Sequence, residues 1–475
     1  MSETPDDDPA LVGLPPPDQT PIAALIPEDE PHGGVPIRSV VGVKLATAMF
    51  LHHFTLGSWI VTLGSYIKAN TGDEGSGIFA AGFVGAAYGA GPLGGMIAPF
   101  LTGLLADHFF ATERIMAILH LVGAAALAAA IYADSQTAFY LAALVYFLSF
   151  IPSFALLSSM TFHHLARPER DFPIARAWST SGWVASGVVV GWLWPWVTGD
   201  NIEMTAMPMK IALVGEILTG AFCLILPHTP PSNKRPRNSS AGFSGSHTLA
   251  LIREPRFMML MALAVLAHAP AQFFYAYFNV YLNTWAGWTG AAAKMTLGQV
   301  VEVVCMLMLP VVLLRVSIKT SILIGLAVWV ARFWMISASA SQEPLMRDVL
   351  LYTAILVHGI AFTLVTISLQ MDVDRCAGRR RRATAQGLLS VAMSGMGCFI
   401  GAELSGMAGA RLLPTQLEGA TVEGWKQFWL LPAGICVGVL LLTALFLPRD
   451  QPLKSVGASL PPPLKEGCGG PRNFC

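Results

Sequence analysis

The sequence predicts an all-α integral membrane protein with twelve transmembrane helices in two halves of six. The first observation is composition: of 475 residues, 54% are hydrophobic and only 12% are charged, whereas about 25% of an average soluble domain is charged. A soluble protein with so few charges could not cover its surface. The second observation is that long apolar stretches recur along the chain. The third is that one long polar interruption, residues 228–256, divides these stretches into two equal sets.

The individual helices are predicted from the length of the apolar stretches. A helix that crosses a hydrocarbon core of ~30 Å needs about 20 residues. Stretches that meet this requirement lie at 41–67, 78–104, 114–133, 137–162, 174–197, 209–227, 257–284, 290–315, 318–338, 349–371, 384–410 and 426–447.

The remaining segments complete the predicted organisation. Residues 1–38 are acidic and rich in proline, and they contain no apolar stretch with a cleavage site. They therefore predict a disordered tail and not an ordinary signal peptide. A six-helix half follows at 39–227, then a cytoplasmic connecting loop at 228–256 and a second half at 257–447. Residues 448–475 predict another disordered tail.

Lysine and arginine predict the orientation, because they concentrate in the cytoplasmic loops of membrane proteins. One set of loops holds Arg114, Arg167, Arg170, Lys234, Arg235, Arg237, Arg253, Arg256, Arg315, Lys319, Arg375 and Arg379 to Arg382. The opposite set holds only scattered cations, namely Lys68, Lys210, Lys294, Arg347 and Arg411. We therefore expect both termini in the cytoplasm, which agrees with an even number of spans. The run Arg379–Arg382 is either a topology anchor or a site for anionic lipid.

Glycines four residues apart mark several predicted helices, for example Gly85 with Gly89 and Gly397 with Gly401. Small residues let helix backbones approach closely in lipid. The pattern fits tight packing, faces that slide or rock, or both.

Ionisable residues inside predicted spans need a reason, because each costs about 2.5–3.5 kcal/mol on insertion. Glu302 lies about halfway along 290–315, and Gln299 lies three residues earlier on the same helix face. Burial favours the neutral form of a carboxyl unless a cation pairs with it. Glu302 is therefore a candidate for proton coupling or substrate binding. The alternative is a structural pair with a buried arginine.

Two further helices carry polar residues on one face. Gln272, Tyr275 and Asn279 form a stripe in 257–284, which indicates either hydrogen bonds between helices or a cavity wall. His358 and Phe362 share a face of 349–371. A lone histidine in an apolar helix is more often a structural group than a functional one.

Five other polar side chains lie in predicted spans. His52 and His53 point in different directions, so at most one faces a central cavity. Arg332, deep in 318–338, is a structural partner for a buried carboxylate or a substrate ligand. Arg176 lies near the cytoplasmic start of 174–197, where a snorkelling anchor is the simplest interpretation. Thr180 lies one turn further along the same face.

Several function classes are excluded by the sequence. The net charge is zero, so no basic field favours nucleic acid. The seven cysteines are scattered, and no Cys/His spacing predicts a metal site or a disulfide framework. No phosphate-binding loop or nucleophile–base spacing is present, which argues against ATP-driven transport and against an enzyme. We expect no cofactor, no metal and no obligate protein partner.

Motifs along the chain indicate a family. Two sets of six helices with a long basic connection resemble the major facilitator superfamily. The segment Gly103-Leu-Leu-Ala-Asp107-His-Phe-Phe-Ala-Thr-Glu-Arg114 resembles its loop between the second and third helices, with a shortened basic end. Six further motifs, in order over roughly residues 40–448, resemble its bacterial nucleoside:proton symporters. They are Gly57-Ser-Trp-Ile-Val-Thr-Leu-Gly-Ser-Tyr66, Asp171-Phe-Pro-Ile-Ala-Arg-Ala-Trp178, Gln299-Val-Val-Glu302, Ala331-Arg-Phe333, Ala385-Gln-Gly387 and Gly395-Met-Gly-Cys-Phe-Ile-Gly401.

The resemblance implies a binding site between the halves, where polar and aromatic side chains hold a nucleoside. The substrate-binding positions of the family fall on Arg176, Thr180, Gln272, Gln299, Glu302 and Phe362. For Arg176 this replaces the interpretation as an anchor.

Three positions depart from the family pattern. Tyr275 stands where the family has an asparagine, and His358 stands where it has a tyrosine. Both are further candidates for substrate binding. Thr363 replaces an aspartate expected directly after Phe362. The loss of that acid leaves Glu302 as the main candidate for proton coupling, with His358 as a second.

We therefore expect a secondary transporter in the inner membrane of a bacterium, alternating access around a midplane site. Its partners would be a nucleoside, a proton and the lipid bilayer. A base would offer a flat face to Phe362 and an edge to Gln272 or Gln299. The alternatives are a transporter of the same fold for another neutral polar substrate such as a sugar, and a transporter-like sensor that binds nucleoside without moving it.

Overall fold

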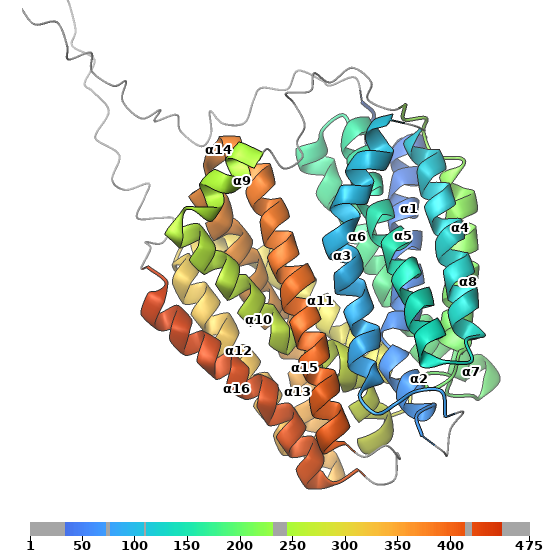
Figure 1. The fold of residues 1–475 in the computed structure, drawn as a ribbon, viewed down its shortest axis with the longest axis vertical. Helices are drawn as coiled ribbons and strands as arrows, with labels where there is room; N and C mark the ends of the chain where they lie inside the picture. Colours follow the sequence, from blue (N-terminus) through green and yellow to red (C-terminus); the bar gives the residue numbers. More distant parts are fainter. Residues whose placement is uncertain (1–33, 73–76, 109–110, 231–244, 414–419, 449–475) are drawn as a thin grey trace, which may run out of the picture.

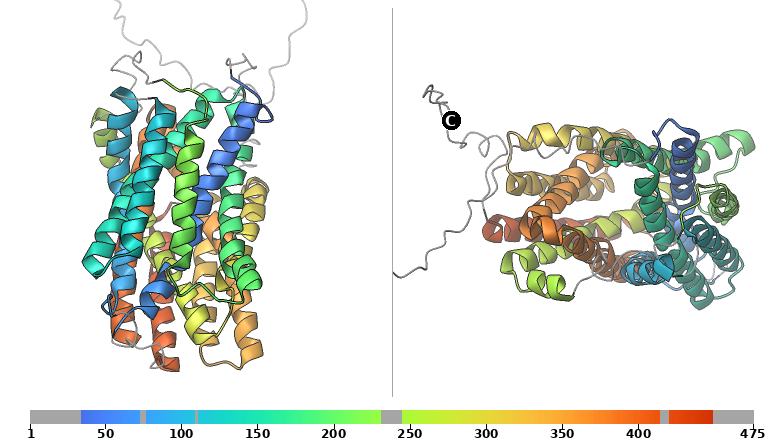
Figure 2. Two further views of the ribbon diagram at one scale, coloured as in Figure 1. Left: turned by 90° about the vertical axis from the view of Figure 1, so that its right-hand side faces the viewer. Right: turned by 90° about the horizontal axis from the view of Figure 1, so that it is seen from above.

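The computed structural model describes residues 34–72, 77–108, 111–230, 245–413 and 420–448. Most of both predicted tails, and residues 231–244 of the predicted connecting loop, lie outside these ranges. Within them the regular structure is helical, and the only β contacts are two isolated bridges. Figure 1 shows the helices of residues 34–230, in blue to green, beside those of residues 245–448, in green to red. The views in Figure 2 agree that the two sets stand side by side. The prediction of an all-α membrane protein is confirmed.

The first set of helices covers the chain up to residue 230. Its members are α1 (Val40–Ile60), α2 (Leu63–Ala69), α3 (Phe83–His108), α4 (Thr112–Ile131), α5 (Gln136–His164), α6 (Pro168–Val188), a π-helical segment η2 (Val189–Leu193), α7 (Trp194–Thr198) and α8 (Met207–Cys223).

The second set begins with a short helix and then alternates long spans with π-helical segments. Its members are α9 (Gly245–Ile252), α10 (Pro255–Val280), η4 (Tyr281–Trp285), α11 (Ala291–Leu313), α12 (Ile318–Ser339), α13 (Pro344–Phe362), η5 (Thr363–Ile367), α14 (Ser368–Ser390), η6 (Val391–Gly397), α15 (Cys398–Leu412) and α16 (Val422–Phe446).

Nine helical stretches of the described residues are long and apolar enough to cross a membrane. Three further predicted spans coincide with α3, with α6 to α7, and with α8, which are not among those nine. The count of twelve spans stays a prediction. One connection differs from expectation. Residues 372–383 were expected to link two spans as a loop. They are instead mostly helical, in two helices that meet at a kink at Gly378, where φ is 68°.

Short polar side chains define where several helices begin. The hydroxyls of Ser39, Ser135, Ser317 and Thr421 each accept a hydrogen bond from the backbone N–H three residues later. The first turn of a helix leaves such N–H groups without a partner, and an N-cap hydroxyl satisfies one of them. These caps fix the ends of α1, α5, α12 and α16.

Glycines bring the two sets into close contact at the end of the molecule that holds α2, at the bottom of Figure 1. A methyl group added to Gly85 of α3 would lie 2.5 Å from the Cα of Gly406 in α15. Gly64 of α2 packs in the same way against the backbone of Ala276 in α10. The spacing of small residues therefore corresponds to tight packing between the sets. We call this the α2 end, and the opposite end, at the top of Figure 1, the α9 end.

Candidate functional site

A cavity of about 990 Å³ lies between the two helix sets. Its walls come from α1, α3, α5 and α6 on one side and from α10, α11, α13, α14, η6 and α15 on the other. Its size is at the upper end of the range usual for small-molecule sites. A site shared by two sets of helices can change its access when one set rocks against the other.

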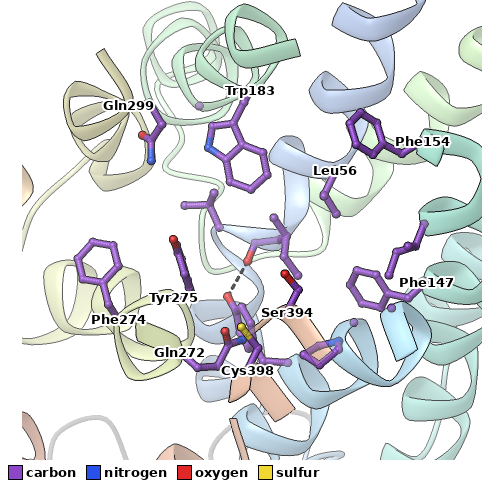
Figure 3. Close-up of a pocket in the computed structure, with 18 of the residues that line it drawn as sticks. Leu56, Phe147, Phe154, Trp183, Gln272, Phe274, Tyr275, Gln299, Ser394 and Cys398 are labelled. Carbon is purple, nitrogen blue, oxygen red and sulfur yellow. Dashed lines mark hydrogen bonds between the residues drawn. The ribbon is translucent and has the colours of Figure 1, made fainter. Parts of the chain in front are cut away.

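The two walls of the cavity differ in chemistry, as Figure 3 shows. The first helix set contributes mainly apolar and aromatic side chains, including Leu56, Phe147, Phe154 and Trp183. The second set contributes most of the polar side chains, namely Gln272, Tyr275, Thr296, Gln299, His358, Ser390, Ser394 and Cys398, together with the apolar side chains of Phe274, Met295 and Ile355. A flat ligand with a polar edge fits between walls of this kind. No lysine, arginine, aspartate or glutamate is among the described lining residues, which suits a neutral ligand.

Four of the predicted site residues line the cavity: Gln272, Tyr275, Gln299 and His358. The polar residues of α10 have both of the roles expected for them. Gln272 and Tyr275 form cavity wall, whereas the Asn279 side chain forms hydrogen bonds between helices, described below.

Glu302 lies one turn along α11 from Gln299, beside the cavity and not in its lining. Its carboxylate Oε2 is 3.9 Å from the Nε2 atom of His358, and its side chain is 18% exposed. The ring of Phe362 lies 5.9 Å from the His358 ring, centroid to centroid. Phe362 therefore reaches the cavity wall through His358 and does not itself line the cavity in this conformation.

Arg176 of α6 approaches the site from the first helix set. Its guanidinium lies 4.7 Å from the centroid of the Phe154 ring, and its Nη1 is 3.3 Å from the Nε2 of His53. Arg176 and Glu302 carry side chains of opposite charge, and their helices, α6 and α11, are in contact. Thr180, half-buried one turn along α6, lies between Arg176 and the cavity residue Trp183.

Among the residues that the structure describes, no carboxylate forms an ion pair with Arg332, the first of the two roles expected for it. The side chain is 1% exposed, its Nε donates to the carbonyl of Ala354 at 2.9 Å, and its guanidinium lies 3.5 Å from the centroid of the Phe274 ring. A backbone dipole and a ring face therefore stabilise the charge in part, while Nη2 of Arg332 is buried without a hydrogen-bond partner among the described residues. Arg332 is also not among the cavity-lining residues, so a direct ligand role has no support in this conformation.

The cavity is closed at the α2 end by hydrogen bonds between the helix sets. Glu203, in the connection between α7 and α8, is fully buried. Its carboxylate accepts from Nδ2 of Asn279 at 2.8 Å, from Nδ2 of Asn283 at 2.9 Å and from the backbone N–H of Ala292 at 3.0 Å. The hydroxyl of Ser65 in α2 donates to Oδ1 of Asn279 at 2.6 Å. We call these side chains the Glu203 network.

Comparison with protein-family models identifies the family to which the chain belongs. The model of the nucleoside H⁺ symporters matches residues 40–451. The chain belongs to the nucleoside H⁺ symporter family. The Escherichia coli protein YegT is 31% identical over 407 residues, which are 85% of this chain and 92% of that protein. The nucleoside permease NupG of Escherichia coli is 26% identical over 408 residues, 83% of this chain and 93% of NupG.

Solved structures agree with this assignment to the nucleoside H⁺ symporters. A crystal structure of NupG superposes with a TM-score of 0.75 at 25% sequence identity and covers 86% of this chain and all of that one (100%). A peptide transporter, POT, shares the fold at a TM-score of 0.65 and 15% identity. The chain therefore has the major facilitator fold, and it is a multi-pass transporter of the bacterial inner membrane and not an enzyme.

Some features of this symporter were missed at the level of sequence. Phe147, Phe154 and Trp183 line the cavity, but an aromatic residue in an apolar helix gives no signal that separates a ligand wall from lipid or core packing. Glu216 was also missed, although it lies within the predicted span 209–227. The signal that pointed to Glu302, an ionisable group inside a span, would have found it.

Proposed function

We propose that this symporter imports nucleosides together with protons by alternating access, with the halves 39–227 and 257–447 moving as units around the cavity. The observation that carries the proposal is the cavity itself, with an aromatic wall facing an amide and hydroxyl wall. A nucleoside has the matching parts: a flat base, a polar base edge and a ribose with several hydroxyls.

Recognition follows from the two walls. The base would lie against the aromatic wall formed by Phe154 and Trp183, since base stacking on an aromatic ring contributes about 1–3 kcal/mol in other systems. Gln272 and Gln299 each offer a donor and an acceptor to the base edge or the ribose. Tyr275, whose ring is perpendicular (88°) to that of His358, would complete the polar side. Phe362 would act through His358, or directly in another conformation.

Glu302 is the proposed proton carrier. When protonated, its carboxyl donates a hydrogen bond to a substrate oxygen, so proton and nucleoside favour each other's binding, and linkage makes this coupling reciprocal. When ionised, it is attracted to Arg176. A proton and the Arg176 guanidinium would compete for the Glu302 carboxylate. Protonation of Glu302 would therefore be linked to how closely α6 and α11 approach each other. His358, 3.9 Å away, would accept the proton on release.

The proposed orientation has both termini in the cytoplasm, supported by the lysine and arginine distribution in the loops. The α2 end would then face the periplasm and the α9 end the cytoplasm. With the Glu203 network intact, the cavity would be closed to the periplasm in this conformation.

The test is transport by purified protein in proteoliposomes. We expect labelled uridine or another nucleoside to accumulate under an inward proton gradient, and to exchange in counterflow without a gradient. Unlabelled nucleosides should compete, whereas sugars should not. Competition by sugars alone would overturn nucleoside as the substrate. Saturable nucleoside binding without counterflow would instead identify a sensor.

A further inference from the structure

The cavity has two edges at which helices of the two sets meet, and each edge presents different side chains. At one edge α6 contacts α11, and Trp183 and Gln299 line the cavity there. At the other edge α3 contacts η6, and η6 with its two flanking residues contributes Ser390, Ser394 and Cys398. Figure 3 shows Ser394 and Cys398 apart from Trp183 and Gln299. Substrate recognition as proposed above assigns no role to this α3–η6 edge.

A π-helical turn explains why three residues of the α3–η6 edge share one face. Ser390, Ser394 and Cys398 are four positions apart, and all three line the cavity. In an α-helix, residues four and eight positions on are turned away by about 40° and 80°, because each turn holds 3.6 residues. The wider turn of η6, a rare kind of segment that often occurs at functional sites, offsets this drift. Two hydroxyls and a thiol therefore follow one another along the cavity wall.

The two serine hydroxyls of this edge are available to a ligand. Several serines in other helices donate to a carbonyl of their own helix, as Ser158 and Ser405 do at 2.9 and 2.7 Å. In the part of the chain that the structure describes, the hydroxyls of Ser390 and Ser394 have no such partner. Both side chains are exposed and line the cavity. A serine hydroxyl carries one donor and two acceptor sites, and at these two positions a bound ligand can use all of them.

The α3 side of this edge leaves room for a ligand group beside the hydroxyls. Met96 of α3 packs on Gly395 of η6, where an added methyl group would lie 2.5 Å from Cγ of Met96. The residues just before them, Gly95 and Ser394, both line the cavity. A methyl group added to Gly95 would meet one atom within 4 Å, Cδ1 of Ile151 at 3.7 Å. The cavity near Ser394 is therefore bounded by α3 backbone at Gly95, which leaves space for a small polar group.

We propose that Ser390 and Ser394 bind the 2′- and 3′-hydroxyls of a ribose, so that the transporter selects ribonucleosides over deoxynucleosides. A glutamine amide holds its donors and its acceptor in one plane, which suits a base edge. A serine hydroxyl rotates, and it both donates and accepts, which suits a sugar hydroxyl. With the base against Trp183 and its edge at Gln299, the ribose extends toward the α3–η6 edge. A site that bonds a substrate hydroxyl discriminates against an analogue without it, because the polar group of the site then loses its partner. This inference rests on the proposed transport of nucleosides.

The experiment measures the dissociation constants of the purified full chain for uridine and adenosine, each compared with its 2′,3′-dideoxy analogue. We expect wild-type protein to bind the nucleoside at least about fivefold more tightly than the analogue, which corresponds to two hydrogen bonds at the low end of their usual strength. Ser394→Ala, and independently Ser390→Ala, should weaken nucleoside binding about 2- to 12-fold and change binding of the analogue by less than about twofold. Ser405→Ala is the matched control, because this fully buried hydroxyl is bonded to the carbonyl of Ala402 in its own helix.

The outcomes separate the two proposals. Wild-type protein that neither binds nor exchanges either nucleoside would overturn the proposed function. Wild-type binding with equal affinity for a nucleoside and its dideoxy analogue would overturn the ribose site alone. The same conclusion follows if the serine variants weaken nucleoside and analogue by the same factor, because a packing defect does not distinguish the two ligands. Ser159→Ala removes a cavity-lining hydroxyl of α5, and a loss specific to the ribonucleoside in that variant alone would contradict the proposal, since the ribose would then lie on the opposite wall.

Discussion

The Glu203 network predicts how strongly the α2 end is held closed. We consider Glu203→Ala, which removes the acceptor shared by Asn279, Asn283 and the backbone N–H of Ala292. These donors belong to the second helix set, whereas Glu203 belongs to the first. Their bonds can therefore form only while the two sets are together at this end. Opening that end must break them.

The size of the shift toward the open state depends on the hydrogen bonds of Glu203 whose donors have no other acceptor. Asn283 keeps two other contacts, with the carbonyl and Oδ1 of Asn279 at 3.0 and 3.2 Å, so it loses little. The Asn279 and Ala292 donors lose an acceptor that is charged, and such bonds are worth about 1.5–3 kcal/mol each. The carboxylate regains hydration on opening, which offsets part of that sum. A net shift of about 2–3 kcal/mol corresponds to roughly 30- to 150-fold more open protein.

The assay uses a cysteine already present in the cavity wall, Cys398. A membrane-impermeant thiol reagent applied from the α2 side reaches Cys398 only when that end opens. We expect its labelling rate, read by peptide mass spectrometry, to rise at least tenfold in Glu203→Ala. Glu423→Ala is the matched control, because Glu423 is an exposed carboxylate near the start of α16, and Cys398→Ser checks the labelled position. An unchanged rate in folded Glu203→Ala would refute the idea that the network holds the end closed.

Three further predictions concern the site and the orientation. Gln272→Ala and Phe362→Ala should both weaken nucleoside binding. Direct stacking of the base on Phe362 in another conformation would make its loss worth about 1–3 kcal/mol, or roughly 5- to 150-fold, and unchanged affinity in monodisperse Phe362→Ala would reject a role for that ring. Glu302→Gln resembles the protonated carboxyl, so it should keep binding and counterflow, lose the pH dependence of binding, and fail to concentrate nucleoside; accumulation by this variant would exclude Glu302 as the coupling group. Reporter fusions after Pro448 and within Ser239–Ser246 should remain cytoplasmic, and export of either would contradict the orientation.

The fold was predictable because a bilayer imposes a fixed length on each apolar stretch. The predicted span 137–162 became a helix at Gln136–His164, for example. The exception at α14 has a physical cause. Hydropathy ends where the membrane ends, but helical turns extend past that point on both sides of the kink at Gly378, where two carboxylates have ion-pair partners. Asp372 pairs with Arg256 at 2.7 Å, and Asp374 pairs with Arg382 at the same distance.

The site was only partly predictable, because polarity is visible in a sequence and burial between distant segments is not. Gln272 and Tyr275 interrupt an apolar helix and were found for that reason. Phe154 and Trp183 are large hydrophobic residues, which are ordinary in a helix of a membrane protein, and they were not found. Glu203 lies in a connection between helices, where a charged residue is ordinary, and only the packing of the second helix set buries it completely.

Three buried or half-buried carboxylates of this transporter differ in what balances their charge, and the difference assigns their roles. Glu203 accepts hydrogen bonds from neutral N–H donors of the opposite helix set, so the stability of its buried carboxylate depends on conformation and not on a proton. Glu216 has an imidazole and a phenol of its own helix set as partners, so these contacts do not depend on the opposite set. Glu302, beside the cavity, is attracted to Arg176 of the other set and lies near His358. Of these three carboxylates, we propose that Glu302 responds to conformation, to protonation and to substrate, which is the combination that a coupling group requires.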